Sequence, residues 1–143
     1  MVLLDTSSDK AYFSKIRERL APRGQAGLQI ITIDESYFSA YRSSVDFIQK
    51  YVFPGGMLPS MQALRGQVAQ AGLVWRDEMM FGLDYAQTLA RWRVRFMGAW
   101  EDISTLGFDE RFKRLWNYYL SYCEAGFRAG SIDVTQIAVV RPL

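Results

Sequence analysis

Three short segments of the sequence are rich in apolar and β-branched residues, and longer segments with helical periodicity separate them. The expected strands are residues 26–33 (AGLQIITI), 73–81 (LVWRDEMMF) and 132–140 (IDVTQIAVV). The first of these contains no charged residue, which is typical of a strand buried on both faces of a parallel sheet. Strands that alternate with helices in this way predict an α/β fold with three strands.

The helix-patterned segments are separated by recognisable stop signals. We expect one helix through residues 35–52, which Pro54, Gly55 and Gly56 terminate. Ser60 is the expected cap of the next helix. Two long helices follow. The first begins with a capping-box-like pair at Asp84 and Gln87, and the second carries an apolar ridge; their apolar faces are expected to contain Leu89, Trp92, Phe96, Trp100, Phe112, Leu115, Trp116, Tyr119, Leu120, Cys123 and Phe127. No repeat or linker divides the sequence, so residues 1–143 are expected to form a single domain.

Composition excludes several classes of function. Histidine is absent, which removes the commonest general base and the commonest zinc ligand, so no metal site is expected. The net charge is only +2 and no basic patch contains interleaved stacking aromatics, so no nucleic-acid partner is expected. The single cysteine, Cys123, cannot form an internal disulfide, which fits a reducing cytoplasm. We interpret Cys123 as a small core residue rather than a nucleophile.

The expected α/β sheet is incomplete. A doubly wound sheet places its phosphate or nucleoside site in the turn after its first strand. No glycine-rich turn from a strand to a helix occurs in the sequence, because Gly55 and Gly56 follow a helix instead. Only MVLLDT precedes the first expected helical segment, SSDKAYFSKIRERLAPRG (residues 7–24). We therefore expect the second half of such a domain, with the first strands and the cofactor turn absent.

Three motifs in a fixed order carry a resemblance to a known family. They are FIQKYVFPGGMLPS (residues 47–60), GLDYAQTLARW (82–92) and FDERFKRLWNYYLSYCEAGFRAGSIDVTQ (108–136). From about Tyr12 onward, the sequence resembles the C-terminal half of the cyclopropane-fatty-acyl-phospholipid synthase family, which includes the mycolic acid cyclopropane synthases. These are S-adenosylmethionine-dependent methyltransferases. The resemblance implies the C-terminal part of a Rossmann-like class I methyltransferase fold.

The resemblance also implies an activity. Family enzymes transfer a methyl or methylene group from S-adenosylmethionine to the double bond of an unsaturated phospholipid acyl chain. The resulting carbocation loses a proton, which a bound bicarbonate is thought to accept. Because the cofactor-binding glycines have no counterpart in this sequence, neither cofactor is expected to bind this chain alone, and whether the isolated chain is an enzyme stays open. The alternative is a non-catalytic lipid-binding or interaction remnant of the family.

Two site residues follow from the resemblance. Tyr85 matches the family position whose phenol helps to hold the bicarbonate, and Ile33 matches a position that contacts the same anion through its backbone. The residue two positions before Ile33 is commonly histidine in the ring-forming synthases, whereas this chain has Ile31. Ring closure and plain methylation therefore both stay open as outcomes.

An apolar loop is the expected contact for the acyl chain. Phe53, Met57 and Leu58 surround the Pro-Gly-Gly break, and with aromatic helical residues such as Trp92 they could line an apolar channel. The alternative is that these loop residues only seat the loop on the core.

Basic residues on the two long helices suggest a membrane partner. Arginine and lysine side chains could attract an anionic lipid surface and bring a cytoplasmic protein into peripheral contact with the inner membrane; they are Arg91, Arg93, Arg95, Arg111, Lys113 and Arg114. The alternative is a solvated basic face that is partly balanced by Glu101, Asp109 and Glu110.

The incomplete sheet predicts a partner chain. An uncovered edge at residues 26–33 would lack proline and charge, and natural proteins avoid leaving such an edge bare. We expect this edge to be covered by a second copy in a homo-oligomer or by a separate cofactor-binding half.

Overall fold

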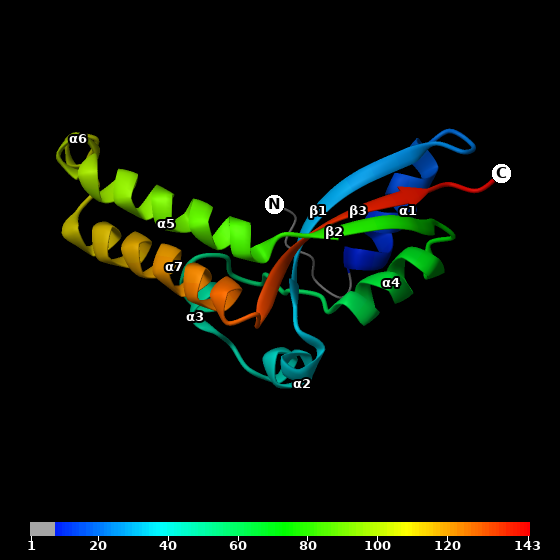
Figure 1. Ribbon diagram of the computed structural model, residues 1–143, viewed down its shortest axis with the longest axis horizontal. Helices are drawn as coiled ribbons and strands as arrows, with labels where there is room; N and C mark the ends of the chain where they lie inside the picture. Colours follow the sequence, from blue (N-terminus) through cyan, green and yellow to red (C-terminus); the bar gives the residue numbers. More distant parts are fainter. Residues whose placement is uncertain (1–7) are drawn as a thin grey trace. The chain divides into compact units, whose positions relative to one another are not determined.

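The computed structural model describes residues 8–143, which form two compact units (Figure 1). The sheet unit comprises residues 8–81 and 132–143 of this range. The helical unit comprises residues 82–131 and is inserted between the two parts of the sheet unit. Each unit is described separately below.

The sheet unit contains the three expected strands. They are β1 (Gln25–Ile33), β2 (Val74–Met80) and β3 (Ile132–Val140), in the spatial order β1-β3-β2. Both outer strands pair antiparallel with β3, and residues Gln25 to Ile33 pair in register with Val140 to Ile132. Among the residues described, β1 has an antiparallel neighbour, because β3 runs back between two strands that share one direction. A parallel neighbour at the other edge of β1 stays a prediction.

Burial along β1 also differs from the expectation. The strand is exposed or half-buried up to Gln29, and full burial begins only at Ile30. The uncharged, apolar sequence of β1 is compatible with burial along both faces and also with burial mainly at the carboxyl end. The structure shows the second arrangement.

The core of the sheet unit lies between the sheet and two helices. In α4 (Met61–Gln70), Leu64 and Val68 are one turn apart and buried, because they lie on the same helix face. The α1 helix (Ser8–Arg19) adds Phe13 to the same cluster. Ser60 caps α4 as expected, since its side chain accepts a hydrogen bond from the amide of Ala63. The cluster is completed by Ile30, Ala71, Leu73, Ile137 and Val139.

The end of β3 is fastened to the end of α1. The Arg141 Nη1 atom donates hydrogen bonds to the carbonyl oxygens of Arg17 and Leu20, at 3.2 and 2.6 Å. The backbone of Arg141 also exchanges hydrogen bonds with Arg23 and Gly24, each of 2.9 Å. A cation at this position satisfies the last carbonyl groups of the helix and complements its dipole.

The single helix expected through residues 35–52 is wrong. The structure has two helices there, α2 (Glu35–Ser43) and α3 (Phe47–Tyr51). Asp46 begins the second with a capping box: its carboxylate accepts from the amide of Gln49 at 2.8 Å, and the Gln49 side chain accepts from the amide of Asp46 at 3.0 Å. This reciprocal pair stabilises a helix start in the middle of a continuous apolar stripe.

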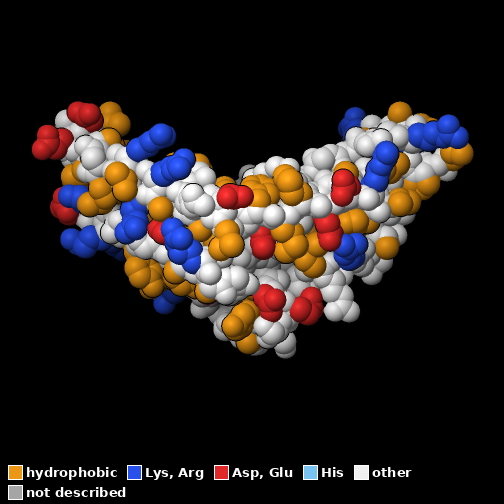
Figure 2. Space-filling view, viewed as in Figure 1, with side chains coloured by type: hydrophobic (Ala, Val, Ile, Leu, Met, Phe, Trp, Pro, Cys, Tyr) orange, Lys and Arg blue, Asp and Glu red, His pale blue; other side chains and the backbone are white. Residues whose placement is uncertain are grey.

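The helical unit consists of α5 (Gly82–Gly98), α6 (Trp100–Thr105) and α7 (Glu110–Arg128). The α5 and α7 helices pack along a seam that buries Ala86, Leu89 and Leu120. The helix α5 begins at Gly82, so Asp84 lies in its first turn and is not the expected cap, and Trp100 belongs to α6. Lys and Arg side chains lie beside hydrophobic ones over this unit (Figure 2).

Within residues 8–143, no helix is both long enough and apolar enough to cross a bilayer.

Candidate functional site

The predicted site residues divide between the two units. Ile33 and the loop residues Phe53, Met57 and Leu58 belong to the sheet unit, whereas Tyr85 and Trp92 belong to the helical unit. The structure therefore defines two separate parts of the predicted site.

In the helical unit, the ring of Tyr85 is held between two larger aromatic side chains. Its centroid lies 5.3 Å from that of Phe127 on α7 and 6.0 Å from that of Trp92 on α5, and both contacts are edge-to-face at 77°. Phe127 is buried, whereas Trp92 is 46% exposed. Edge-to-face contacts of this kind fix the plane of a ring while leaving its polar tip accessible to a partner.

Two further residues adjoin the Tyr85 hydroxyl, and sequence reasoning assigned neither to the site. Burial, with a smaller contribution from Cys123, raises the pKa of Tyr85. Burial raises the pKa of Tyr119 far above its usual range, and Cys123 and Tyr85 raise it further. Tyr119, Cys123 and Phe127 follow one another at four-residue spacing on α7, so they form one stripe facing Tyr85. This four-residue spacing was the sequence signal that could have assigned Tyr119 and Cys123 to the site.

This cluster favours some chemistry and disfavours other chemistry. With raised pKa values, both phenols stay protonated at neutral pH, so they donate hydrogen bonds and do not act as bases. A neutral phenol can hold an anion such as bicarbonate through a donated hydrogen bond. The aromatic faces around it can stabilise a developing positive charge. The cluster can therefore donate hydrogen bonds to an anion.

In the sheet unit, Ile33 lies at the carboxyl end of β1 beside the end of the apolar loop. It is 8% exposed, and its amide donates a 3.0 Å hydrogen bond to the carbonyl of Pro59. Ile33 also forms a parallel bridge with Ser60. The preceding residue, Thr32, points to the other face, where its hydroxyl lies 3.3 Å from that of Thr135. Because Pro59 uses the Ile33 amide here, contact between this backbone and an anion stays a prediction.

The loop between α3 and α4 places its apolar residues at intermediate depth. Phe53, Met57 and Leu58 are all half-buried. The amide of Phe53 donates to the carbonyl of Ile48, and Gly55 has a φ of 80°, a left-handed conformation that favours glycine. Half-burial fits a loop that rests partly on the core and presents apolar atoms to a ligand, so the lipid role of these residues stays a prediction.

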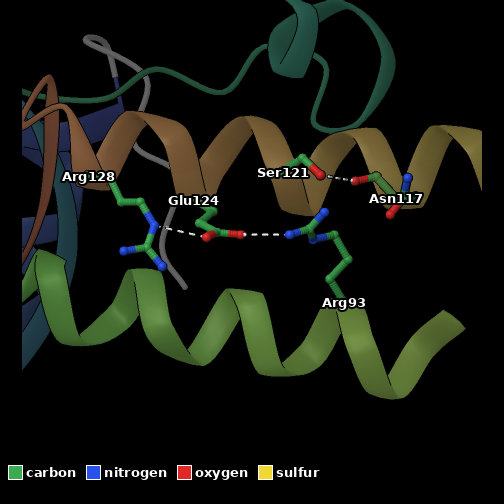
Figure 3. Close-up of polar contacts among 5 residues, drawn as sticks. All are labelled: Arg93, Asn117, Ser121, Glu124 and Arg128. Carbon is green, nitrogen blue, oxygen red and sulfur yellow. Dashed lines mark hydrogen bonds and ion pairs between the residues drawn. The ribbon is translucent and has the colours of Figure 1, made fainter. Parts of the chain in front are cut away.

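An ion-pair network joins the two long helices. Glu124 on α7 contacts Arg93 on α5 at 3.4 Å and Arg128 on its own helix at 2.9 Å (Figure 3). Its side chain is only 14% exposed. Lys113 also has local partners, since it lies 3.4 Å from Glu110 and above the ring of Trp100. Two of the six basic residues assigned to a membrane surface thus interact within the helical unit.

Metal ligation has no visible basis in the described range. Among residues 8–143, no three His, Cys, Asp or Glu side chains lie together in a way that could hold an ion.

The sequence matches a family model. The model described as mycolic acid cyclopropane synthetase matches residues 4–137. Tuberculostearic acid methyltransferase of Mycobacterium tuberculosis is 43% identical over 131 residues, which cover 91% of this chain and 31% of that protein. Cyclopropane-fatty-acyl-phospholipid synthase of Escherichia coli is 37% identical over 131 residues, covering 91% of this chain and 32% of that protein. The chain spans about a third of the length of these curated relatives.

Solved structures share the fold. A mycolic acid cyclopropane synthase complexed with SAH and CTAB superposes with a TM-score of 0.85 at 24% identity, covering 97% of this chain and 52% of that one. A cyclopropane synthase from Mycobacterium tuberculosis gives a TM-score of 0.84 at 22% identity, covering 96% and 51%. The predicted fold class, part of an α/β methyltransferase fold with three strands, is confirmed.

Proposed function

We propose that this chain, which belongs to the mycolic acid cyclopropane synthetase family, supplies the lipid-facing part of an S-adenosylmethionine-dependent methyltransferase. The substrate would be the double bond of an unsaturated lipid acyl chain. One observation supports the assignment most directly: the neutral, half-buried phenol of Tyr85 lies among aromatic rings and beside a second protonated phenol.

The residues of this chain would have separate tasks in that reaction. Tyr85 donates a hydrogen bond to a bicarbonate and so holds the proton acceptor in place. Trp92 and Phe127 keep the Tyr85 ring in one plane, and their faces favour positive charge on the acyl chain. The loop residues Phe53, Met57 and Leu58 contact the acyl chain and exclude water.

The described residues of this chain fit bicarbonate better than they fit S-adenosylmethionine. The hydroxyl of Tyr85 suits bicarbonate, because a protonated phenol is a donor and the anion is an acceptor. S-adenosylmethionine supplies the methyl group when bound, but residues 8–143 contain no glycine-rich strand-to-helix turn to hold it. We therefore propose that the 143-residue chain alone neither binds this cofactor nor turns over lipid. Calorimetric titration would test this, and micromolar binding would contradict it.

The product has two candidates. Ile31 offers no proton-accepting or donating side chain at the position that is commonly histidine in ring-forming members, which favours methylation without ring closure. The 43% identity to a protein named as a methyltransferase, against 37% to a named synthase, points the same way. Ring closure stays the alternative, and chromatography of the fatty-acid methyl esters separates the two products.

A chimera would test the activity. Residues 12–143 would replace the matching segment of the Escherichia coli synthase, and the chimera would be expressed in cells that lack their own synthase. We expect modified acyl chains in the lipid extract. In the purified chimera, Tyr85→Phe should lower kcat about 10- to 100-fold with little change in KM, because it removes the donated hydrogen bond and keeps the ring.

The chimera has a matched control. Tyr37→Phe changes an exposed tyrosine of α2 in the same way and should leave kcat unchanged. Equal turnover in the Tyr85→Phe and parent chimeras would reduce Tyr85 to a structural residue. A folded chimera that binds lipid but never modifies it would favour the alternative function, a non-catalytic lipid-binding protein.

We also propose that the outer edge of β1 is covered by another chain. Strand β2, at the opposite edge, carries Arg76, Asp77 and Glu78 and has a bulge between Trp75 and Asp77, features that protect an edge from pairing. Strand β1 has neither charge nor proline over its length. The covering chain would be a second copy or a cofactor-binding half. If a second copy covers the edge, light scattering at micromolar concentration should show a dimer or larger species. A monodisperse monomer would contradict coverage by a second copy.

A further inference from the structure

One stripe along α7 combines positive charge with exposed aromatic rings. Arg111, Arg114, Tyr118 and Tyr122 recur at intervals of three and four residues, so they share the helix face opposite the buried Leu120, Cys123 and Phe127. All four are exposed, with Tyr118 at 52% and Tyr122 at 39%. The two tyrosine rings stack, with centroids 6.0 Å apart and planes at 27°.

The acidic residues of α7 lie off this stripe and interact with other groups. Glu110 accepts a 3.0 Å hydrogen bond from the indole of Trp100 and lies 3.4 Å from Lys113. Glu124 lies between Arg93 and Arg128, on the seam side of the helix (Figure 3). Within residues 8–143, neither Arg111 nor Arg114 has a carboxylate within ion-pair distance. The stripe therefore presents positive charge that the helix does not neutralise.

The outward face of α5 has a different composition. It also carries two exposed arginines, Arg91 and Arg95, but its first turn contains the exposed Asp84 and its last turn contains Gly98. No pair of stacked rings lies on that face among the described residues. The two outward faces thus offer two exposed arginines each, and only the face on α7 adds neighbouring tyrosines.

We propose that the stripe Arg111, Arg114, Tyr118 and Tyr122 docks the protein on an anionic phospholipid bilayer. Its charge is complementary to anionic head groups. Tyrosine, with an apolar ring and a polar tip, is enriched at the level of the head groups. The apolar stems of the arginines can lie against acyl chains while their guanidinium groups remain at the phosphates. The proposal rests on the proposed function, since an acyl-chain substrate resides in a bilayer.

Vesicle co-sedimentation of the 143-residue chain tests the proposal without any turnover. The probe is an equal mixture of phosphatidylglycerol and phosphatidylcholine, compared with phosphatidylcholine alone. We expect binding to the anionic vesicles that weakens at high salt. Arg111→Gln with Arg114→Gln should weaken this binding about 30-fold, from the usual contribution of each basic residue near a membrane.

The matched control is Arg91→Gln with Arg95→Gln, which removes the same charge from α5. We expect a clearly smaller loss for this pair. Tyr118→Ser with Tyr122→Ser should weaken binding at both low and high salt. The double change removes the contact of the tyrosine rings with the bilayer, which salt does not screen. Circular dichroism establishes that each variant is folded.

Three results would overturn the proposal. The first is an equal or larger loss of vesicle binding for the α5 arginine pair, and the second is unchanged binding by the α7 arginine variant. The third is that the parent chain shows no salt-sensitive binding to anionic vesicles. This third result is expected if the stripe binds an acidic protein surface instead. Failure of the proposed function would appear separately, as a chimera that binds vesicles and modifies no lipid.

Discussion

The sheet unit and the helical unit are stabilised by different kinds of contact. In the sheet unit, Phe13, Leu64 and Val68 are at most 1% exposed and pack into one continuous cluster. In the helical unit, the buried residues of α5 and α7 include Ala86, Leu89 and Leu120, and most of the large rings remain partly exposed. The first unit concentrates hydrophobic burial, and the second holds its chemical groups in fixed orientations.

The rings of the helical unit form a connected series. Phe108, Phe112, Trp116 and Tyr119 follow one another along α7, with successive centroid separations of 4.5, 5.8 and 5.0 Å. Each such pair contributes about 0.5–1.5 kcal/mol beyond its buried area. Partly exposed rings add less hydrophobic stability than fully buried ones.

A pair of leucine truncations tests this contrast most strongly. Leu64→Ala in the sheet unit should lower the free energy of unfolding by about 3 kcal/mol, because it leaves a cavity in a tightly packed cluster. Leu89→Ala in the helical unit removes an equally buried side chain, at 3% exposure, but two helices can close a gap more easily. Urea denaturation should show the smaller loss for Leu89→Ala. Equal losses would mean that both units are packed alike.

The ion pairs provide a second, smaller test. Glu124→Gln leaves Arg93 and Arg128 without their carboxylate and should lower the free energy of unfolding by about 1 kcal/mol. The matched change in the sheet unit is Glu78→Gln, which breaks the more exposed pair with Arg65 and should have almost no effect. The difference between the two variants should shrink when the denaturation is repeated at high salt. If Glu78→Gln is the more damaging change, the helical unit does not depend on its ion pairs.

The smallest expected effect is on how the stability of the folded protein changes with alkaline pH. Burial raises the pKa of Tyr119, so the folded protein keeps this phenol protonated when the unfolded chain has begun to ionise it. The resulting stability is present below the ordinary tyrosine pKa of about 10 and is lost as the pH rises above it. Tyr119→Phe should therefore flatten the fall in stability above that pH, as urea denaturation at a series of alkaline pH values would measure. Identical profiles for parent and Tyr119→Phe would show that this phenol titrates normally.

The elements with a simple period were predictable from the sequence. The three strands, the long helix α7 and the Ser60 cap were all read correctly, because each depends on residues close together in the chain. The break between α2 and α3 was missed although Asp46 and Gln49 stand at capping-box spacing, since a continuous apolar stripe outweighed that local signal. The antiparallel pairing of β1 depends on a strand about a hundred residues away and has no local signature.

The candidate site was predictable only in part. Tyr85 was assigned to the site through a family motif, and its place near a helix start agrees with the structure, whereas its role in the site stays a prediction. Tyr119 and Cys123 were read as parts of an ordinary apolar ridge, because only the packing of α7 against α5 brings them to Tyr85. The roles of Ile33 and of the loop residues stay predictions, because ligand contact has no local sequence pattern.

The strand order of the sheet has a consequence for biosynthesis. Among residues 8–143, β1 and β2 do not pair with each other, and each is joined to this sheet through β3. Because β3 is the last of the three to be synthesised, the sheet cannot assemble while the ribosome is still translating the helical unit. The α5–α7 hairpin depends on nearby residues and can form first. During that interval β1 lacks its β3 partner and carries no charge, so the nascent chain should need chaperone protection until Ile132–Val140 inserts between its two partners.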